Sequence, residues 1–170
     1  MAFRALMTAH YSYVYRLVYG IVRHEHDARD ICQEVWLTVW RKLPDYQGVG
    51  KFTTWLHPIA TRRALDHLRK RRRWYDRFLP FASGSDANHT IDATVGEDGR
   101  SDNDRADLRD RLDQALATLP PMQRTVLTLR EVQGLSYEEI AKAAGIPAGT
   151  VMSRLYHARR LLAKKLKENP

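Results

Sequence analysis

The residues best suited to chemistry lie near the C-terminal end, on one face of a helix that the pattern predicts after Pro147. Their side chains are small, hydrogen-bonding or cationic: Thr150, Met152, Ser153, Arg154, Tyr156, His157, Arg159 and Arg160. No acidic residue occurs between Glu139 and Glu168. A helix N-terminus offers free N–H groups to phosphate, and side chains of these types contact phosphates and base edges. The pattern predicts binding to double-stranded nucleic acid.

A helix-turn-helix is the element that must position this face. Ser136 and Glu139 have the spacing of a capping box, and Gly145 supplies a left-handed turn residue. The second helix has apolar residues at helical spacing: Val151, Leu155, Ala158 and Leu162. Two short helices joined by a glycine-containing turn form the helix-turn-helix unit. The competing interpretation is a helical hairpin with an ordinary basic face.

A second group of candidate residues combines aromatic rings with cations in the first half of the chain. It consists of Tyr46, Phe52, Trp55, Trp74 and Tyr75 near Lys51, Arg62, Arg63 and the run Arg69–Arg73. Aromatic faces in a basic groove hold unstacked single strands. Two simpler roles stay open, because Phe52 and Trp55 suit a core and a basic run suits a solvated helix end.

The whole chain reads as helices, a polar stretch, then helices. Apolar residues at helical spacing predict helices from about Phe3 to Val22, from Asp27 to Pro44 and from Thr53 to Arg73. In the second of these, the predicted inward stripe is Ile31, Val35 and Val39, with Cys32, Trp36 and Trp40 alongside it. Pro58 would kink the third helix unless it lies in the first turn. A further amphipathic helix is predicted from Leu108, Leu112, Leu116 and Leu119, and Pro120 ends it.

Ser, Gly, Asn and Asp replace this periodicity between the two helical parts. The predicted fold is therefore all-α, with two small helical domains at 1–77 and 107–170 and a flexible linker at 78–106. The net charge of +8 favours a polyanionic partner. Cys32, the single cysteine, suits a core position and a reducing compartment. No apolar segment is long enough to span a bilayer, and no signal peptide is evident, so we expect a cytoplasmic protein without membrane insertion.

Three function classes compete on this evidence. An enzyme acting on nucleic acid needs a nucleophile or a metal cluster, and the only grouping, His24, Glu25 and His26, has no second ligand set at regular spacing. We therefore expect no catalytic residues, no metal and no cofactor. A stand-alone repressor or activator usually dimerises to read two half-sites, and no helix is left for that purpose. The remaining class is a subunit that recognises DNA as part of a larger protein complex.

Two long stretches resemble the RNA polymerase sigma factors of the extracytoplasmic-function class, group IV of the sigma-70 family. The first contains DARDICQEVWLTVW (27–40), FTTWL (52–56) and RALDHLR (63–69). The second contains GLSYEEIA (134–141) and GIPAGTVMSRL (145–155). The resemblance implies that 1–77 is like sigma region 2 and that 107–170 is like sigma region 4. It also implies a function, which is promoter recognition and melting with core RNA polymerase.

By the same resemblance, a face of the second helix docks on polymerase. Its residues are Asp30, Gln33, Glu34, Leu37, Trp40 and Arg41. The −10 element, partly single-stranded, would be bound by Tyr46, Gln47, Gly48, Lys51, Arg62, Arg63, Asp66, His67 and Lys70. The −35 duplex would be bound by Arg124, Arg130, Ala148, Gly149, Thr150, Met152, Ser153, Arg154, Tyr156, His157 and Arg159.

The chain departs from the family pattern at two of these positions. Many members have Asn where Arg62 stands and a basic residue where Met152 stands, so base preference there is open. Family members are often held inactive by an anti-sigma factor, which makes one an expected partner. We expect no homo-oligomer.

Overall fold

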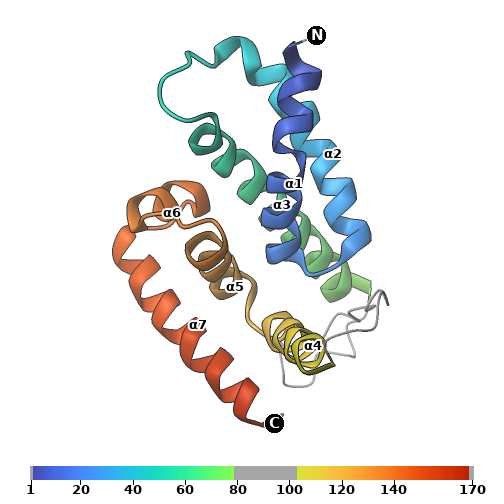
Figure 1. Cartoon of the computed structure of the whole chain (residues 1–170), viewed down its shortest axis with the longest axis vertical. Coiled ribbons are helices and arrows are strands. Elements are labelled where there is room, and N and C mark those ends of the chain that lie inside the picture. Colours follow the sequence, from blue (N-terminus) through green and yellow to red (C-terminus); the bar gives the residue numbers. More distant parts are fainter. Residues whose placement is uncertain (1, 79–102, 169–170) are drawn as a thin grey trace.

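The computed structural model describes residues 2–78 and 103–168, and within these ranges every regular element is helical (Figure 1). Helices α1, α2 and α3, with a short 3₁₀ turn η1, form an N-terminal bundle. Helices α4 to α7, with a π-helical turn η2, form a C-terminal bundle. Their bounds are α1 Ala2–Val22, α2 Glu25–Lys42, η1 Leu43–Asp45, α3 Phe52–Phe78, α4 Asn103–Ala117, α5 Pro121–Leu127, η2 Thr128–Val132, α6 Tyr137–Ala144 and α7 Ala148–Glu168.

Local chemistry accounts for the start and end of α2. His24 caps its N-terminus, since Nδ1 of His24 accepts a hydrogen bond from the Asp27 backbone N–H at 3.3 Å. Glu25 and Asp27 lie in the first turn, where carboxylates suit the helix dipole. The helix therefore begins two residues before the predicted Asp27. Pro44 ends it in the 3₁₀ turn η1.

Helix α3 is longer than predicted and runs through Pro58 without interruption. Proline lacks an N–H, so the Thr54 carbonyl loses its usual intrahelical partner. The flanking residues Leu56, His57 and Ala60 are buried, and tertiary packing holds this part of the helix in place.

The predicted inward stripe of α2 is buried. Ile31, Cys32, Val35 and Val39 are at most 2% exposed, but Trp40 is 59% exposed and lies edge-on against Phe3. Trp40, expected alongside this stripe and on the polymerase-docking face, lies at the exposed edge of the helix. Burial raises the pKa of Cys32 to about 12, so its thiol stays protonated at neutral pH.

The helices also reach into the stretch expected to be linker. Helix α3 continues to Phe78 and α4 begins at Asn103, which leaves 79–102 outside the described residues. In α4, Leu108 and Leu112 are exposed, whereas Leu119, just after the helix, is buried. Only the C-terminal end of the predicted apolar stripe packs into the core.

The two bundles do not have separate cores. Buried residues of both, such as Leu17 and Leu56 in the first and Leu129 and Leu155 in the second, belong to one hydrophobic cluster. Helix α1 packs against α5, and α3 packs against α6 (Figure 1). A small domain alone buries little surface, so a shared core stabilises both bundles.

Candidate nucleic-acid interface

The helix-turn-helix has the local structure that its sequence predicts. Oγ of Ser136 accepts from the Glu139 backbone N–H at 3.2 Å, and Glu139 Oε2 accepts from the Ser136 N–H at 2.9 Å. Helix α6 ends at Gly145, whose φ of +69° is left-handed. The capping box, the left-handed glycine and the start of α7 directly after Pro147 were all predicted correctly.

Helix α7 presents the predicted outward face. Val151, Leu155 and Ala158 are at most 2% exposed and fix the helix against the core. Seven of the predicted residues on its opposite side are exposed: Ala148, Gly149, Met152, Ser153, Tyr156, His157 and Arg159. Thr150 and Arg154 are half-buried. One helix therefore brings nine of the eleven expected −35 residues to a single surface or its edge.

Tertiary structure brings an acid to this otherwise acid-free helix. Glu131, from η2, accepts a hydrogen bond from Arg159 at 2.6 Å, and this bond raises the pKa of Arg159. Arg130 lies nearby, stacks over the Tyr137 ring at 5.3 Å and donates to the Leu135 carbonyl at 2.7 Å. The ion pair with Glu131 thus holds Arg159 in place, and one N–H group of Arg130 is hydrogen-bonded to the backbone.

Arg124 does not lie on this surface, although the family resemblance implied contact with DNA. Its side chain is 4% exposed and points into the contact between the two bundles. Nε donates to the Ile21 carbonyl at 2.7 Å, and Nη1 donates to the Ala117 carbonyl at 2.9 Å. Burial, together with the neighbouring charge of Arg23, lowers the pKa of Arg124 to about 10. In this arrangement Arg124 is structural.

A second candidate surface lies at the loop between η1 and α3. Rings of Tyr46, Phe52 and Trp55 contact one another with centroid separations of 5.2 to 5.6 Å. The Tyr46 hydroxyl donates to the Gly50 carbonyl at 3.3 Å, and Gly50 itself has a φ of +77°. The aromatic side chains therefore fold the loop back over the start of α3.

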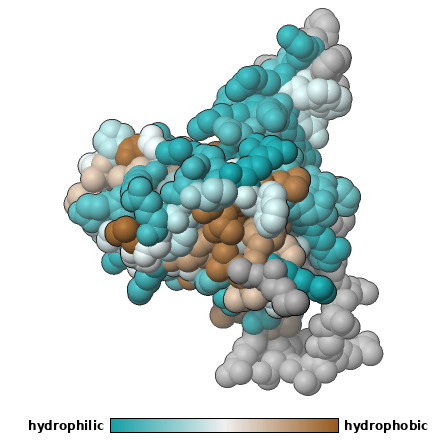
Figure 2. Space-filling model, turned by 90° about the horizontal axis from the view of Figure 1, so that it is seen from above, coloured by the Kyte–Doolittle hydropathy of each residue, from teal (hydrophilic) through white to brown (hydrophobic). Residues whose placement is uncertain are grey.

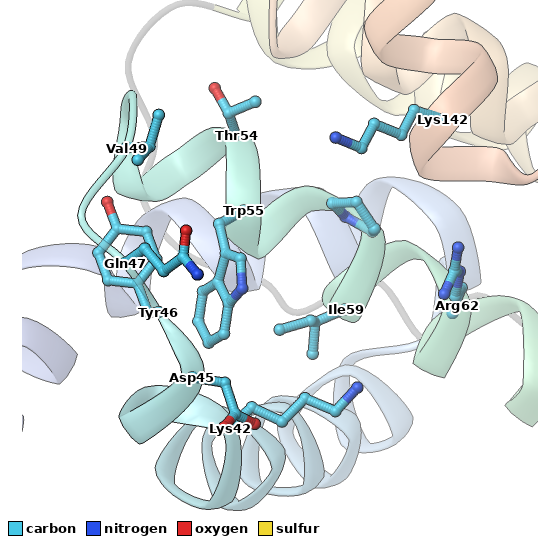
Figure 3. Close-up of a pocket in the computed structure, with 11 residues that line it drawn as sticks. Lys42, Asp45, Tyr46, Gln47, Val49, Thr54, Trp55, Ile59, Arg62 and Lys142 are labelled. Atoms are coloured by element: carbon cyan, nitrogen blue, oxygen red, sulfur yellow. The ribbon is translucent and has the colours of Figure 1, made fainter.

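An open cleft of about 450 Å³ lies beside these rings (Figure 3). It is lined by Lys42, Asp45, Tyr46, Gln47, Val49, Thr54, Trp55, Pro58, Ile59, Arg62 and Lys142. Trp55 and Ile59 give it an apolar floor, and Arg62 contributes a cation. The cleft could hold a flat, partly charged ligand such as an unstacked nucleotide.

Lys142 is a lining residue that was not expected from the sequence. It belongs to α6 of the C-terminal bundle and points toward the cleft (Figure 3). No local pattern could have found it, because its position depends on how the two bundles pack.

Some of the remaining predicted −10 residues are exposed to solvent, and others contact the neighbouring helix α2. Gln47, Gly48, Lys51, Arg62, Asp66 and Lys70 are exposed. Arg63 instead donates to Thr38 Oγ1 of α2 at 3.0 Å, and Nε2 of His67 lies 3.2 Å from Asp27. The structure brings Tyr46, Gln47 and Arg62 to the cleft, whereas Arg63 and His67 hold α3 against α2.

A third surface runs along α2. The six residues expected to bind polymerase are all exposed: Asp30, Gln33, Glu34, Leu37, Trp40 and Arg41. They follow the helical spacing of one face, and Leu37 is 58% exposed. Exposed large apolar residues among charges are typical of a protein-docking face.

Two other kinds of site are not found in the described parts of the chain. Within 2–78 and 103–168, no three His, Cys, Asp or Glu residues are grouped so that they could hold a metal. No helix in these ranges has the length and apolar character needed to cross a bilayer.

Comparison with known proteins shows the family of this chain. The family model for sigma-70 region 2 matches residues 6–74, and that for sigma-70 region 4 matches residues 109–162. The ECF RNA polymerase sigma-E factor of Escherichia coli is 34% identical over 146 residues, with 82% of this chain and 74% of the relative covered. The chain belongs to the ECF RNA polymerase sigma factors.

Further relatives of this sigma factor support the assignment. The RNA polymerase sigma-H factor of Pseudomonas aeruginosa is 37% identical, with 91% of this chain and 82% of the relative covered. The ECF sigma factor SigE of Mycolicibacterium smegmatis is also 37% identical, but the match spans 92% of this chain and 58% of that relative.

A solved structure shares the fold of this sigma factor across its length. It is the sigma factor RpoE of Bartonella quintana, solved with the anti-sigma factor NepR, with a TM-score of 0.73 and 24% identity. The match covers 99% of both chains. We call residues 6–74 region 2 and residues 109–162 region 4 from here on.

Proposed function

We propose that this sigma factor directs core RNA polymerase to promoters by reading two DNA elements and helping to melt one of them. The observation that supports the proposal is that two candidate nucleic-acid surfaces and one candidate docking face lie on separate elements of one chain. These are the cleft beside Trp55, the outward face of α7 and the exposed face of α2.

Each surface has a distinct physical role in this proposal. Helix α7 enters the major groove of the −35 duplex, where Ser153 and Tyr156 reach base edges and Arg159 contacts phosphate. The cleft accepts a base flipped from the −10 strand against Trp55, because stacking offsets the loss of pairing. Helix α2 attaches the protein to polymerase through Leu37 and its charged neighbours.

The chain supplies binding only, and polymerase performs the nucleotide chemistry. The protein needs no cofactor, acts as one copy per polymerase and works in the cytoplasm. An anti-sigma factor is part of the proposal, since the Bartonella protein of the same fold was solved bound to one.

Reconstituted transcription on a matched promoter tests the proposal. Core polymerase with this protein should make a defined transcript that core polymerase alone does not make. Tight binding to duplex promoter DNA without polymerase, combined with no transcript, would instead favour a stand-alone repressor.

Two surface variants, each with its own control variant, test the assigned roles within the same assay. Leu37→Glu places a charge on the docking face and should lower affinity for core polymerase, whereas Tyr11→Glu, at an exposed position of α1, should not.

Lys51→Ala should reduce open-complex formation without changing polymerase binding. Its matched control is Lys167→Ala, which changes an exposed lysine at the far end of α7. Loss of transcription in both controls would contradict these assignments.

A further inference from the structure

The cleft beside Trp55 carries more positive charge than one nucleotide of a DNA strand requires. Three cationic side chains line it, Lys42, Arg62 and Lys142, and they face a single carboxylate, that of Asp45. All four side chains are exposed, and none of them forms an ion pair within 2–78 and 103–168. A nucleic-acid strand brings one phosphate charge per nucleotide. The cleft therefore suits a ligand with several negative charges close to one base.

The three cations come from three different elements. Lys42 is the last residue of α2, Arg62 lies in α3 and Lys142 lies in α6. In the view of Figure 3, the Trp55 ring lies between Lys142 on one side and Lys42 on the other. Charges of one sign around a cleft raise the local concentration of a ligand of the opposite sign. The arrangement therefore attracts an anion toward the aromatic floor.

Neighbouring side chains hold the floor of the cleft in place. The ring centroids of Tyr46 and Trp55 are 5.2 Å apart, and those of Phe52 and Trp55 are 5.6 Å apart. The Tyr46 hydroxyl is in turn hydrogen-bonded to the Gly50 carbonyl. Trp55 is half-buried, so part of its ring still faces the cleft. A preorganised ring loses little conformational freedom when a base stacks on it.

The spacing along α3 separates a stacking position from a charged one. Trp55, Ile59 and Arg62 are spaced at four and three residues, which places them on one face of the helix. Arg62 lies about 10 Å further along the helix axis than Trp55, at 1.5 Å per residue. A guanidinium binds phosphate oxygens through two parallel N–H donors. A ligand that reaches both residues needs a flat ring at one end and an anionic group at the other.

The size and lining of the cleft fit a free small molecule. Its volume is about 450 Å³. Sites for small molecules measure about 300–1,000 Å³ and combine apolar walls with a few convergent polar groups. Gln47 and Thr54 add neutral hydrogen-bonding groups to the lining, next to the aromatic floor. A sugar between a base and its phosphates would find partners there.

We propose that this cleft binds a free nucleoside triphosphate, with the base on Trp55 and the phosphates between Arg62 and Lys142. The proposal rests on the proposed function in one respect, because the flipped base of the −10 strand uses the same floor. The free nucleotide and the −10 strand therefore exclude each other. Lys142 belongs to region 4, so the bound nucleotide contacts both regions.

Titration calorimetry of the full chain, without polymerase or DNA, tests the proposal. The probes are ATP, inorganic tripolyphosphate and adenosine. ATP should bind at least about tenfold more tightly than either of the other two, because only ATP engages both the ring and the cations. Its affinity should fall as salt concentration rises, since the cations contribute through charge.

Variants of the two cations locate the bound nucleotide. Arg62→Ala and Lys142→Ala should each weaken ATP binding about tenfold, because each removes a charged hydrogen bond to phosphate. Arg77→Ala, at an exposed position near the end of α3, and Lys167→Ala, on α7, are the matched controls and should bind ATP as the wild type does. All four positions are exposed, so the helical circular dichroism signal should be the same in every variant.

Three results would overturn the proposal. The first is no binding of ATP up to about 1 mM, which corresponds to a negligible affinity for a dedicated site. The second is tripolyphosphate that binds as tightly as ATP, since this would show a site for any polyanion. The third is equal affinity in the wild type and both cleft variants. Transcription by the wild type with core polymerase tests the proposed function separately, so failure of one proposal is distinguishable from failure of the other.

Discussion

At the scale of single residues, burial controls the chemistry of the titratable groups in the core. His57 is 5% exposed, and its ring contacts the Tyr13 hydroxyl. Burial lowers the pKa of His57 below its ordinary 6.5, and the nearby charge of Glu139 opposes this effect. The ring is therefore neutral in the folded protein under conditions where an exposed histidine begins to take up a proton.

The lowered pKa of His57 predicts a loss of stability in mild acid. The unfolded chain takes up a proton near the ordinary pKa, whereas the folded chain takes it up only at lower pH. The free energy of unfolding should therefore fall as pH decreases from about 7 to about 5. His57→Gln keeps a hydrogen-bonding side chain for Tyr13 and should make this fall shallower. Urea unfolding at several pH values gives the two slopes, and identical slopes would refute the assignment.

The outward residues of α7 divide into those that read bases and those that anchor phosphate. Ser153→Ala or Tyr156→Ala should change −35 sequence preference, at about 1–3 kcal/mol for each lost base contact. Arg159→Ala should weaken binding equally on all sequences and reduce the salt slope by about 1. Titrations of matched and mismatched duplexes at several salt concentrations distinguish the two patterns. The same profile from all three variants would argue against this division.

At the scale of elements, the capping box orients the helix-turn-helix. Ser136 and Glu139 each satisfy a backbone N–H at the start of α6. Gly145, in the left-handed conformation, then ends α6 and turns the chain toward α7. Val151, Leu155 and Ala158 hold α7 against the core, and this packing determines which side of the helix faces solvent.

Loss of the cap should destabilise the protein without touching the DNA surface. Ser136→Ala leaves the Glu139 N–H without its partner and should cost about 1 kcal/mol of unfolding free energy. Ser12→Ala, at an exposed position of α1, should change it by less than about 0.5 kcal/mol. Chemical denaturation of both variants provides the comparison. An effect of Ser136→Ala no larger than that of the control would mean that the capping box adds nothing.

At the scale of the whole molecule, the shared core couples the two regions. Buried residues of regions 2 and 4 form one cluster, and the side chain of Arg124 crosses between them. Outside this core, the face of the molecule seen in Figure 2 is largely hydrophilic. Its apolar side chains are gathered in limited patches. Stability and the spacing of the DNA surfaces therefore depend on the same contact.

A shared core predicts that both regions unfold in one transition. All four tryptophans, Trp36, Trp40, Trp55 and Trp74, lie in α2 and α3, so their fluorescence reports on region 2. Far-ultraviolet circular dichroism reports on helices of both regions. The two signals should give the same urea midpoint in the wild type. Separate midpoints would show that the regions fold independently.

The sequence by itself determined the features that depend on neighbouring residues. Helical spacing, the box of Ser136 and Glu139, and the glycine at 145 each specify local backbone through hydrogen bonds and steric limits within a few residues. The outward face of α7 followed from its apolar stripe. The family resemblance, carried by motifs in both halves, then gave the order of the docking and DNA surfaces.

Tertiary structure decided what depends on residues far apart in the chain. The burial of Arg124, the pairing of Arg159 with Glu131 and the place of Lys142 at the cleft all arise from packing between elements. No local pattern encodes such contacts, because they form only where two shapes fit, as Gly20 of α1 and Thr128 of η2 do. The sequence predicted two candidate nucleic-acid surfaces, and only the packing of the bundles determined how far apart they lie.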